Sequence, residues 1–100
     1  MPDNLFSNLS IEELYLDKTK KSKELSELAL EYLPSGITHD SRHMKPYGIY
    51  IDRAQGPHKW DVDGNKYIDF FGGHGALLLG HCHPSVVRAT EAAMGAGTQF

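Results

Sequence analysis

The sequence predicts an α+β segment in which helices precede a small antiparallel sheet and one more helix follows it. Three observations predict this order. Apolar residues recur at helical spacing over residues 25–33, they alternate with polar neighbours from residue 49 onward, and Pro84 precedes a second helical run. Apolar residues make up 40% of the 100 residues and charged residues 23%, which excludes a collagen-like chain and a highly charged disordered tail.

The first helix is predicted to open within residues 10–20. Ser10 and Glu13 have the spacing of a capping box, in which each side chain accepts a hydrogen bond from the other residue's backbone amide. We expect the apolar stripe of the next helix to pack on its own protein, with a partner-binding helix as the alternative, and Pro34 with Gly36 to end it. The stripe occupies positions i, i+3, i+4, i+7 and i+8: Leu25, Leu28, Ala29, Tyr32 and Leu33.

Residues 37–47 are predicted to form a loop, because they show no clear period and are rich in side chains that can hold a ligand. Arg42 lies in this loop near His39 and Asp40. A guanidinium group can bind a carboxylate through two parallel hydrogen bonds, which makes Arg42 a candidate for an anionic ligand. From composition alone, a surface ion pair between Arg42 and Asp40 is the favoured interpretation.

Three short antiparallel strands are predicted next. The first begins near Ile49, where apolar and polar residues alternate. Residues 59–62 and 66–70 form the other two, and the Asp63-Gly64-Asn65 sequence between them is typical of a hairpin because glycine and asparagine tolerate positive φ.

A glycine-rich turn, Gly72-Gly73-His74-Gly75, follows the strands and allows the backbone to approach a ligand closely. A helix is predicted from Pro84 to about Met94, since proline suits the first helical position. The aliphatic run at residues 76–79 and this helix have no obvious sheet to cover. We therefore expect the chain to be the N-terminal part of a larger protein.

His81, Cys82 and His83 form the best candidate for a metal site, because two imidazoles and a thiolate can act as zinc ligands. The sequence has no second Cys or His pair at zinc-site spacing, so no metal is expected. The favoured interpretation is that His83 helps to start the following helix and that His81 bonds to backbone. A single cysteine excludes an internal disulfide and fits a reducing compartment.

Charge and hydropathy exclude two classes of partner. The net charge of −3 leaves no basic excess with which to bind nucleic acid. The longest purely aliphatic stretch, residues 76–79, is far too short to span a membrane, and the first seven residues show no secretory signal. We expect a cytoplasmic protein with neither nucleic-acid nor membrane partners.

Two strings carry a family resemblance. Residues 61–69 read Asp-x-Asp-Gly-Asn-x-Tyr-x-Asp, and residues 79–84 read Leu-Gly-His-x-His-Pro. Over roughly residues 22–100 the chain resembles the N-terminal region of class III aminotransferases, which are pyridoxal-phosphate enzymes of fold type I. The resemblance implies an α/β transferase truncated before its large domain. Residues 1–36 would supply N-terminal helices, and residues 37–100 a loop on the substrate wall, the three-strand meander and the following helix.

The string Pro34-Ser35-Gly36-Ile37 followed by Arg42 is similar to that of the glutamate-1-semialdehyde aminomutase subgroup, in which the arginine holds the substrate carboxylate. The resemblance thus implies Arg42, His39 and His74 as substrate-binding residues. Aminomutases carry a tryptophan where this chain has His74 and a serine where it has His39. The glycine turn is closer to members that resemble D-phenylglycine aminotransferase.

The resemblance implies amino transfer between an amino acid and a keto acid or aldehyde, with pyridoxal phosphate as cofactor, in a homodimer. No catalytic residue is expected in this segment, and its cofactor contacts are unknown, because the family's cofactor lysine, acidic partner and phosphate-binding loop lie downstream. Lys45, Lys59 and Lys66 do not match the lysine motif, so the 100-residue chain alone is expected to be inactive. The alternatives are a small non-enzymatic binding or interaction domain and a His/Cys metal-binding module.

Overall fold

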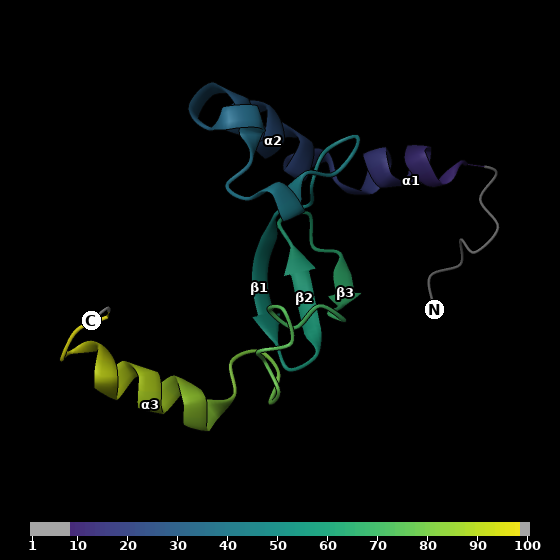
Figure 1. Cartoon of the computed structure of the whole chain (residues 1–100). Coiled ribbons are helices and arrows are strands. Elements are labelled where there is room, and N and C mark those ends of the chain that lie inside the picture. Colours follow the sequence, from purple (N-terminus) through teal and green to yellow (C-terminus); the bar gives the residue numbers. More distant parts are fainter. Residues whose placement is uncertain (1–8, 99–100) are drawn as a thin grey trace. The chain divides into compact units, whose positions relative to one another are not determined.

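The computed structural model describes residues 9–98 of the chain (Figure 1). The sheet contains three strands in the order β1 (Ile51–Gln55), β2 (His58–Asp61) and β3 (Lys66–Ile68). Strand β2 pairs antiparallel with β3, so that Lys59 lies opposite Tyr67. The predicted order of helices, three-strand meander and following helix is confirmed. The elements are α1 (Ile11–Lys18), α2 (Lys20–Tyr32), β1 (Ile51–Gln55), β2 (His58–Asp61), β3 (Lys66–Ile68) and α3 (Pro84–Met94), with short 3-10 turns at Pro34–Gly36 and Asp40–Arg42.

Internal contacts divide the chain into two compact units. The described part of the first unit covers residues 9–50 and 61–65, and that of the second covers residues 51–60 and 66–98. The domain division at residues 36 and 37 stays a prediction. The first seven residues, on which the prediction about a secretory signal rests, lie outside the described residues. None of the helices within residues 9–98 is long and apolar enough to cross a membrane.

In the first unit, side chains from both ends of its sequence fix the starts of the helices. The capping box before α1 is confirmed, since the Ser10 amide donates to Glu13 Oε2 at 2.7 Å and the Glu13 amide donates to Ser10 Oγ at 3.2 Å. At α2 the cap comes from the distant hairpin turn. Asp63 accepts hydrogen bonds from the amides of Lys21 at 2.8 Å and Ser22 at 3.0 Å, which satisfies two donors of the first helical turn.

The core of the first unit is a polar and aromatic junction around Tyr47, which is buried. Its hydroxyl lies 2.9 Å from Thr19 Oγ1, and its carbonyl accepts a hydrogen bond from the Tyr15 hydroxyl at 2.5 Å. The two tyrosine ring centroids are 5.3 Å apart. Burial, followed by the influence of Tyr47 and Asp61, raises the pKa of Tyr15 and so keeps its hydroxyl a donor.

Large apolar side chains remain exposed in both units. In α2, Tyr32 is 75% exposed and Leu28 is 49% exposed, so packing of the predicted stripe stays a prediction. In the second unit, Phe70 and Leu78 are each more than nine-tenths exposed. Leu78 of the aliphatic run is thus uncovered in the described residues, and the expectation that this run and α3 have no sheet to cover stays a prediction.

Candidate substrate-side site

Arg42 and His39 lie at the two ends of one exposed 3-10 turn in the first unit. The Arg42 Nη1 donates to Thr38 Oγ1 at 2.6 Å. Asp40 instead contacts His39, whose Nδ1 lies 2.8 Å from Asp40 Oδ1. The prediction of an ion pair between Arg42 and Asp40 is therefore wrong for the part of the chain that the structure describes. Thr38 engages one of the guanidinium donors, and the exposed group has further N–H donors to offer a carboxylate.

The His39 side chain also organises the backbone of this turn. Its Nδ1 lies 3.1 Å from the amide nitrogen of Ser41 and 2.9 Å from Ser41 Oγ. As the residue preceding the 3-10 turn, His39 acts as its N-terminal cap. The structure thus places two of the three predicted substrate-binding residues on one turn, and it gives His39 a structural task there besides.

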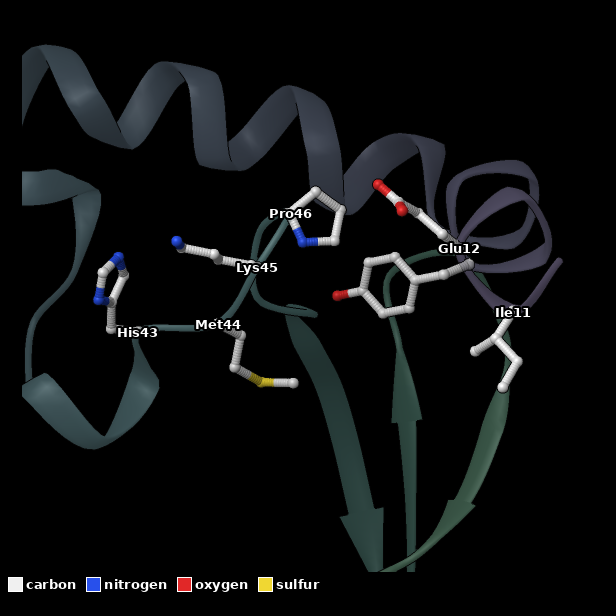
Figure 2. A pocket seen from close by; sticks show the side chains of 7 residues that line it. Ile11, Glu12, His43, Met44, Lys45 and Pro46 are labelled. Carbon is white, nitrogen blue, oxygen red and sulfur yellow. The ribbon is translucent and has the colours of Figure 1, made fainter.

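An open hollow next to this loop was not predicted from the sequence. Its volume is about 850 Å³, and side chains from α1 and from the loop face into it (Figure 2). Lys45 and Glu12 give it one group of each charge, and neither His39 nor Arg42 lines it. Its walls come from two segments, residues 11–15 and 43–46, that are far apart in the sequence, so no local motif signals it. The lining residues are Ile11, Glu12, Tyr15, His43, Met44, Lys45 and Pro46.

His74, the third predicted residue, lies on the glycine turn of the second unit. Its φ of 59° is in the left-handed region, between two glycines that also have positive φ. Its exposed imidazole packs edge-on against the Phe71 ring, with centroids 4.4 Å apart and planes at 60°. Within the described residues, the His74 side chain thus contacts an aromatic ring, and both of its ring nitrogens remain available to a ligand.

Asp69 is the most heavily contacted carboxylate of the second unit, and sequence reasoning missed it. Its Oδ1 accepts hydrogen bonds from the amides of Phe71 at 3.0 Å and Gly72 at 3.2 Å. Its Oδ2 lies 2.6 Å from His81 Nε2 and 3.0 Å from Lys59 Nζ, and the side chain is only 4% exposed. The hydrogen bond from His81 is the main reason that the pKa of Asp69 lies far below its usual range. Burial acts in the opposite direction, and Lys59 and the two amides lower the pKa further.

The structure revises one of the two histidine interpretations and confirms the other. The ring of His81 contacts the Asp69 carboxylate rather than backbone, so that part of the prediction is wrong. The ring of His83 does help to start α3, because its Nδ1 accepts a hydrogen bond from the Ser85 amide at 3.3 Å. Cys82 is exposed, and residues 9–98 contain no group of three or more His, Cys, Asp or Glu side chains placed to hold a metal ion.

Comparison with known proteins decides the family. The profile described as "Aminotransferase class-III" matches residues 38–99. The chain belongs to the class III aminotransferase family. It is 42% identical over 85 residues to a glutamate-1-semialdehyde 2,1-aminomutase of Nitrosomonas europaea, a match that covers 82% of this chain and 20% of that relative. This class III chain thus spans a small part of the length of the relative.

Solved structures of the family share the fold. A β-phenylalanine aminotransferase from Variovorax paradoxus matches with a TM-score of 0.78 and 28% identity, over 84% of this chain and 20% of that one. A structure described as a transaminase with PLP bound matches with a TM-score of 0.76 and 39% identity, over 82% of this chain and 19% of that one. A glutamate-1-semialdehyde aminomutase from Pseudomonas aeruginosa, 20% identical with a TM-score of 0.76 over 86% of this chain and 19% of its own, supports the fold alone.

Membership of this family implies pyridoxal phosphate, but residues 9–98 do not by themselves fit that cofactor. Lys59 is held by Asp69, and the Lys66 ammonium lies 5.5 Å from the centroid of the Trp60 ring. Lys45 lines the open hollow of the first unit.

Proposed function

We propose that this chain forms part of the substrate pocket of a pyridoxal-phosphate-dependent class III aminotransferase. The enzyme would transfer an amino group between an amino acid and a keto acid or aldehyde. The observation that supports this most strongly is the family match over residues 38–99, combined with 42% identity to an aminomutase. The residues that hold the cofactor would lie outside residues 9–98.

In this proposal Arg42 binds the substrate carboxylate, and His39 and His74 are the other substrate-binding residues of the chain. The exposure of Arg42 supports the first role, because its guanidinium can form two parallel hydrogen bonds with a carboxylate. His39 fixes the turn from which Arg42 projects. We further propose a cytoplasmic homodimer with small-molecule substrates and with neither nucleic-acid nor membrane partners.

The role of Arg42 is tested by Arg42→Ala in the complete enzyme. Loss of a charge-assisted contact to the carboxylate should lower kcat/KM by about 10- to 150-fold, mainly through KM. The thermal midpoint should stay unchanged, because Arg42 is exposed and its side-chain partner is the nearby Thr38. Arg42→Lys keeps the charge without the planar fork and should recover only part of the loss. Unchanged kinetics with a lower midpoint would make Arg42 a structural residue.

His74 bears on whether the enzyme transfers amino groups between molecules or isomerises one. Histidine is smaller than the tryptophan of aminomutases, and its exposed ring on the glycine turn supports a wider pocket. We propose that intermolecular transfer from a bulky amino donor is preferred over isomerisation of glutamate-1-semialdehyde. The measurement is kcat/KM for aromatic D-amino acids, β-amino acids and the semialdehyde, in the wild type and in His74→Trp. Efficient isomerisation by the wild type that His74→Trp leaves unaltered would refute this role of His74.

A further inference from the structure

The turn that carries His74 begins at a buried carboxylate. One Asp69 oxygen accepts hydrogen bonds from the amides of Phe71 and Gly72, and its other oxygen contacts His81 and Lys59. Its own amide donates to the Pro57 carbonyl at 2.8 Å. Contacts to residues of the sheet and to amides of the turn therefore fix the orientation of the carboxylate together.

His81 approaches Asp69 from a backbone that is itself held on the sheet. The amide of Gly56 donates to the His81 carbonyl, and the amide of His81 donates to the Gly56 carbonyl, each at 2.9 Å. The neighbouring Gly80 approaches so closely that an added Cβ would lie 2.9 Å from the Gly56 oxygen. The backbone of His81 is thereby held on the sheet, and its Nε2 lies 2.6 Å from Asp69 Oδ2.

Phe71 connects this carboxylate to His74. The Phe71 amide is bound to Asp69, and its carbonyl accepts a hydrogen bond from the Gly75 amide at 3.0 Å. Its ring is the surface on which the His74 imidazole packs. A change in the direction of the Asp69 carboxylate would therefore move both the backbone and the ring that fix the imidazole.

We propose that Asp69 and His81 are a positioning pair for His74, and that this pair thereby sets which side chain of the amino donor fits beside it. The inference rests on the proposed function, in which His74 contacts the substrate. Neither member of the pair touches the donor. They act by holding the start of the turn, so their loss should alter discrimination between donors and leave the reaction itself possible.

The first test uses the complete holoenzyme with His81→Phe, which keeps a ring but removes the donor, and His81→Gln, which restores an N–H donor at the same reach. The readout is the ratio of kcat/KM for an aromatic donor to kcat/KM for alanine. His81→Phe should change this ratio by about tenfold and His81→Gln should restore it, because a small displacement of a group that contacts the donor strongly alters the rate with that donor. His58→Phe is the matched control and should leave the ratio unchanged, because His58 lies in the same unit and its ring contacts Trp60 at a tilt, with centroids 6.0 Å apart.

A double-mutant cycle separates positioning from general support of the fold. In the His74→Ala background, His81→Phe should have no further effect on the donor ratio, because the pair acts through His74. Independent, multiplicative effects of the two substitutions would overturn the inference. Where His81→Phe fails to fold, Asp69→Asn completes the same cycle, since its amide cannot accept the hydrogen bond from His81 in the native orientation.

A second readout does not depend on turnover. Nuclear magnetic resonance of the enzyme labelled at histidine Cε1 should show a His74 signal, assigned by its loss in His74→Ala, that is shifted by the Phe71 ring. The signal should move toward the position of an unstacked imidazole in His81→Phe and return in His81→Gln. A signal unmoved in His81→Phe overturns the positioning pair even where the enzyme turns over. Absence of transamination by the wild type with every donor would refute the proposed function separately.

Discussion

Two aspartates each fix one turn of this chain, and they do so with different kinds of donor. In the hairpin turn of the first unit, Asp61 accepts hydrogen bonds from the amides of Asp63 and Asn65 and from the Asn65 side chain, at 3.0, 2.8 and 2.9 Å. In the glycine turn of the second unit, Asp69 combines two amides with His81 and the Lys59 ammonium. The first set of donors is local and neutral, and the second is partly distant and cationic.

This difference separates a turn that shapes the fold from a turn that, under the proposed function, would carry a substrate-binding residue. The hairpin turn uses its own residues to form a rigid loop, and the fixed loop then presents Asp63 to α2 and Asn65 to the Lys18 carbonyl. The glycine turn depends on groups ten and more residues away, and it presents an imidazole to solvent. Partners that are distant in the sequence couple the Asp69 carboxylate to other parts of its unit.

The largest expected effect is a difference in the stability lost when one glycine of each unit is replaced by alanine. Gly64 and Gly80 both have positive φ, but an added Cβ meets nothing within 4 Å at Gly64 and lies 2.9 Å from the Gly56 carbonyl oxygen at Gly80. Gly64→Ala should cost about 1–2 kcal/mol from backbone strain alone. Gly80→Ala should cost about 2–5 kcal/mol, because strain and overpacking add. Thermal unfolding of the complete protein measures both.

Gly95→Ala is the control for this pair, because its φ is −64° and an added Cβ meets nothing within 4 Å. Its thermal midpoint should be unchanged or slightly raised. Amide exchange should show the damage from Gly80→Ala at Gly56 and His81, whose paired bonds it disrupts. Equal losses for Gly64→Ala and Gly80→Ala would mean that the second unit tolerates a shift of its bridge, and the contrast drawn here would fail.

A smaller effect is expected where the hairpin turn caps α2. Asp63→Ala removes the acceptor of the Lys21 and Ser22 amides and should destabilise the first unit by about 1 kcal/mol, the usual cost of a lost helix cap. Protection from amide exchange should fall at these two positions. Asp52→Ala, an exposed carboxylate on β1, is the control and should leave α2 unchanged. Retained protection at Ser22 in Asp63→Ala would assign the cap to another group.

The sequence predicts what depends on neighbours along the chain and misses what depends on distant partners. The capping box of Ser10 and Glu13, the Asp-Gly-Asn hairpin and the start of α3 at Pro84 are local patterns with a fixed physical cause, and each is confirmed. The contact between Asp69 and His81 joins residues twelve apart across a sheet bridge. No spacing rule signals such a contact before the register of the sheet is known.

The candidate site shows the same limit. Arg42 and His39 could be proposed from the resemblance, and their shared turn follows from their proximity in the sequence. The side-chain partner of Arg42 could not, because Asp40 lies two residues away and Thr38 four, and the backbone conformation decides which of them the guanidinium contacts. The choice falls on Thr38 because the His39 ring already engages Asp40. The hollow lined by Lys45 and Glu12 is a property of tertiary packing and left no trace in the sequence.

The smallest expected effect is the response of the glycine turn to mild acid. The pKa of Asp69 is lowered in the folded chain, chiefly by His81, so its contribution to stability is complete above the ordinary aspartate pKa of about 4. That contribution is lost only as the pH falls through the lower folded value. An imidazole can donate a hydrogen bond from Nε2 in its charged form and in one of its neutral tautomers. Amide protection at Phe71 and Gly72, corrected for the intrinsic pH dependence of exchange, should therefore not change between pH 7 and pH 5 and should fall below pH 4. In Asp69→Asn, protection at both amides should be a few-fold lower than in the wild type above pH 4, and the acid dependence should disappear. Loss of protection already between pH 7 and pH 5 in the wild type would show that ionisation of a group other than Asp69 governs the turn.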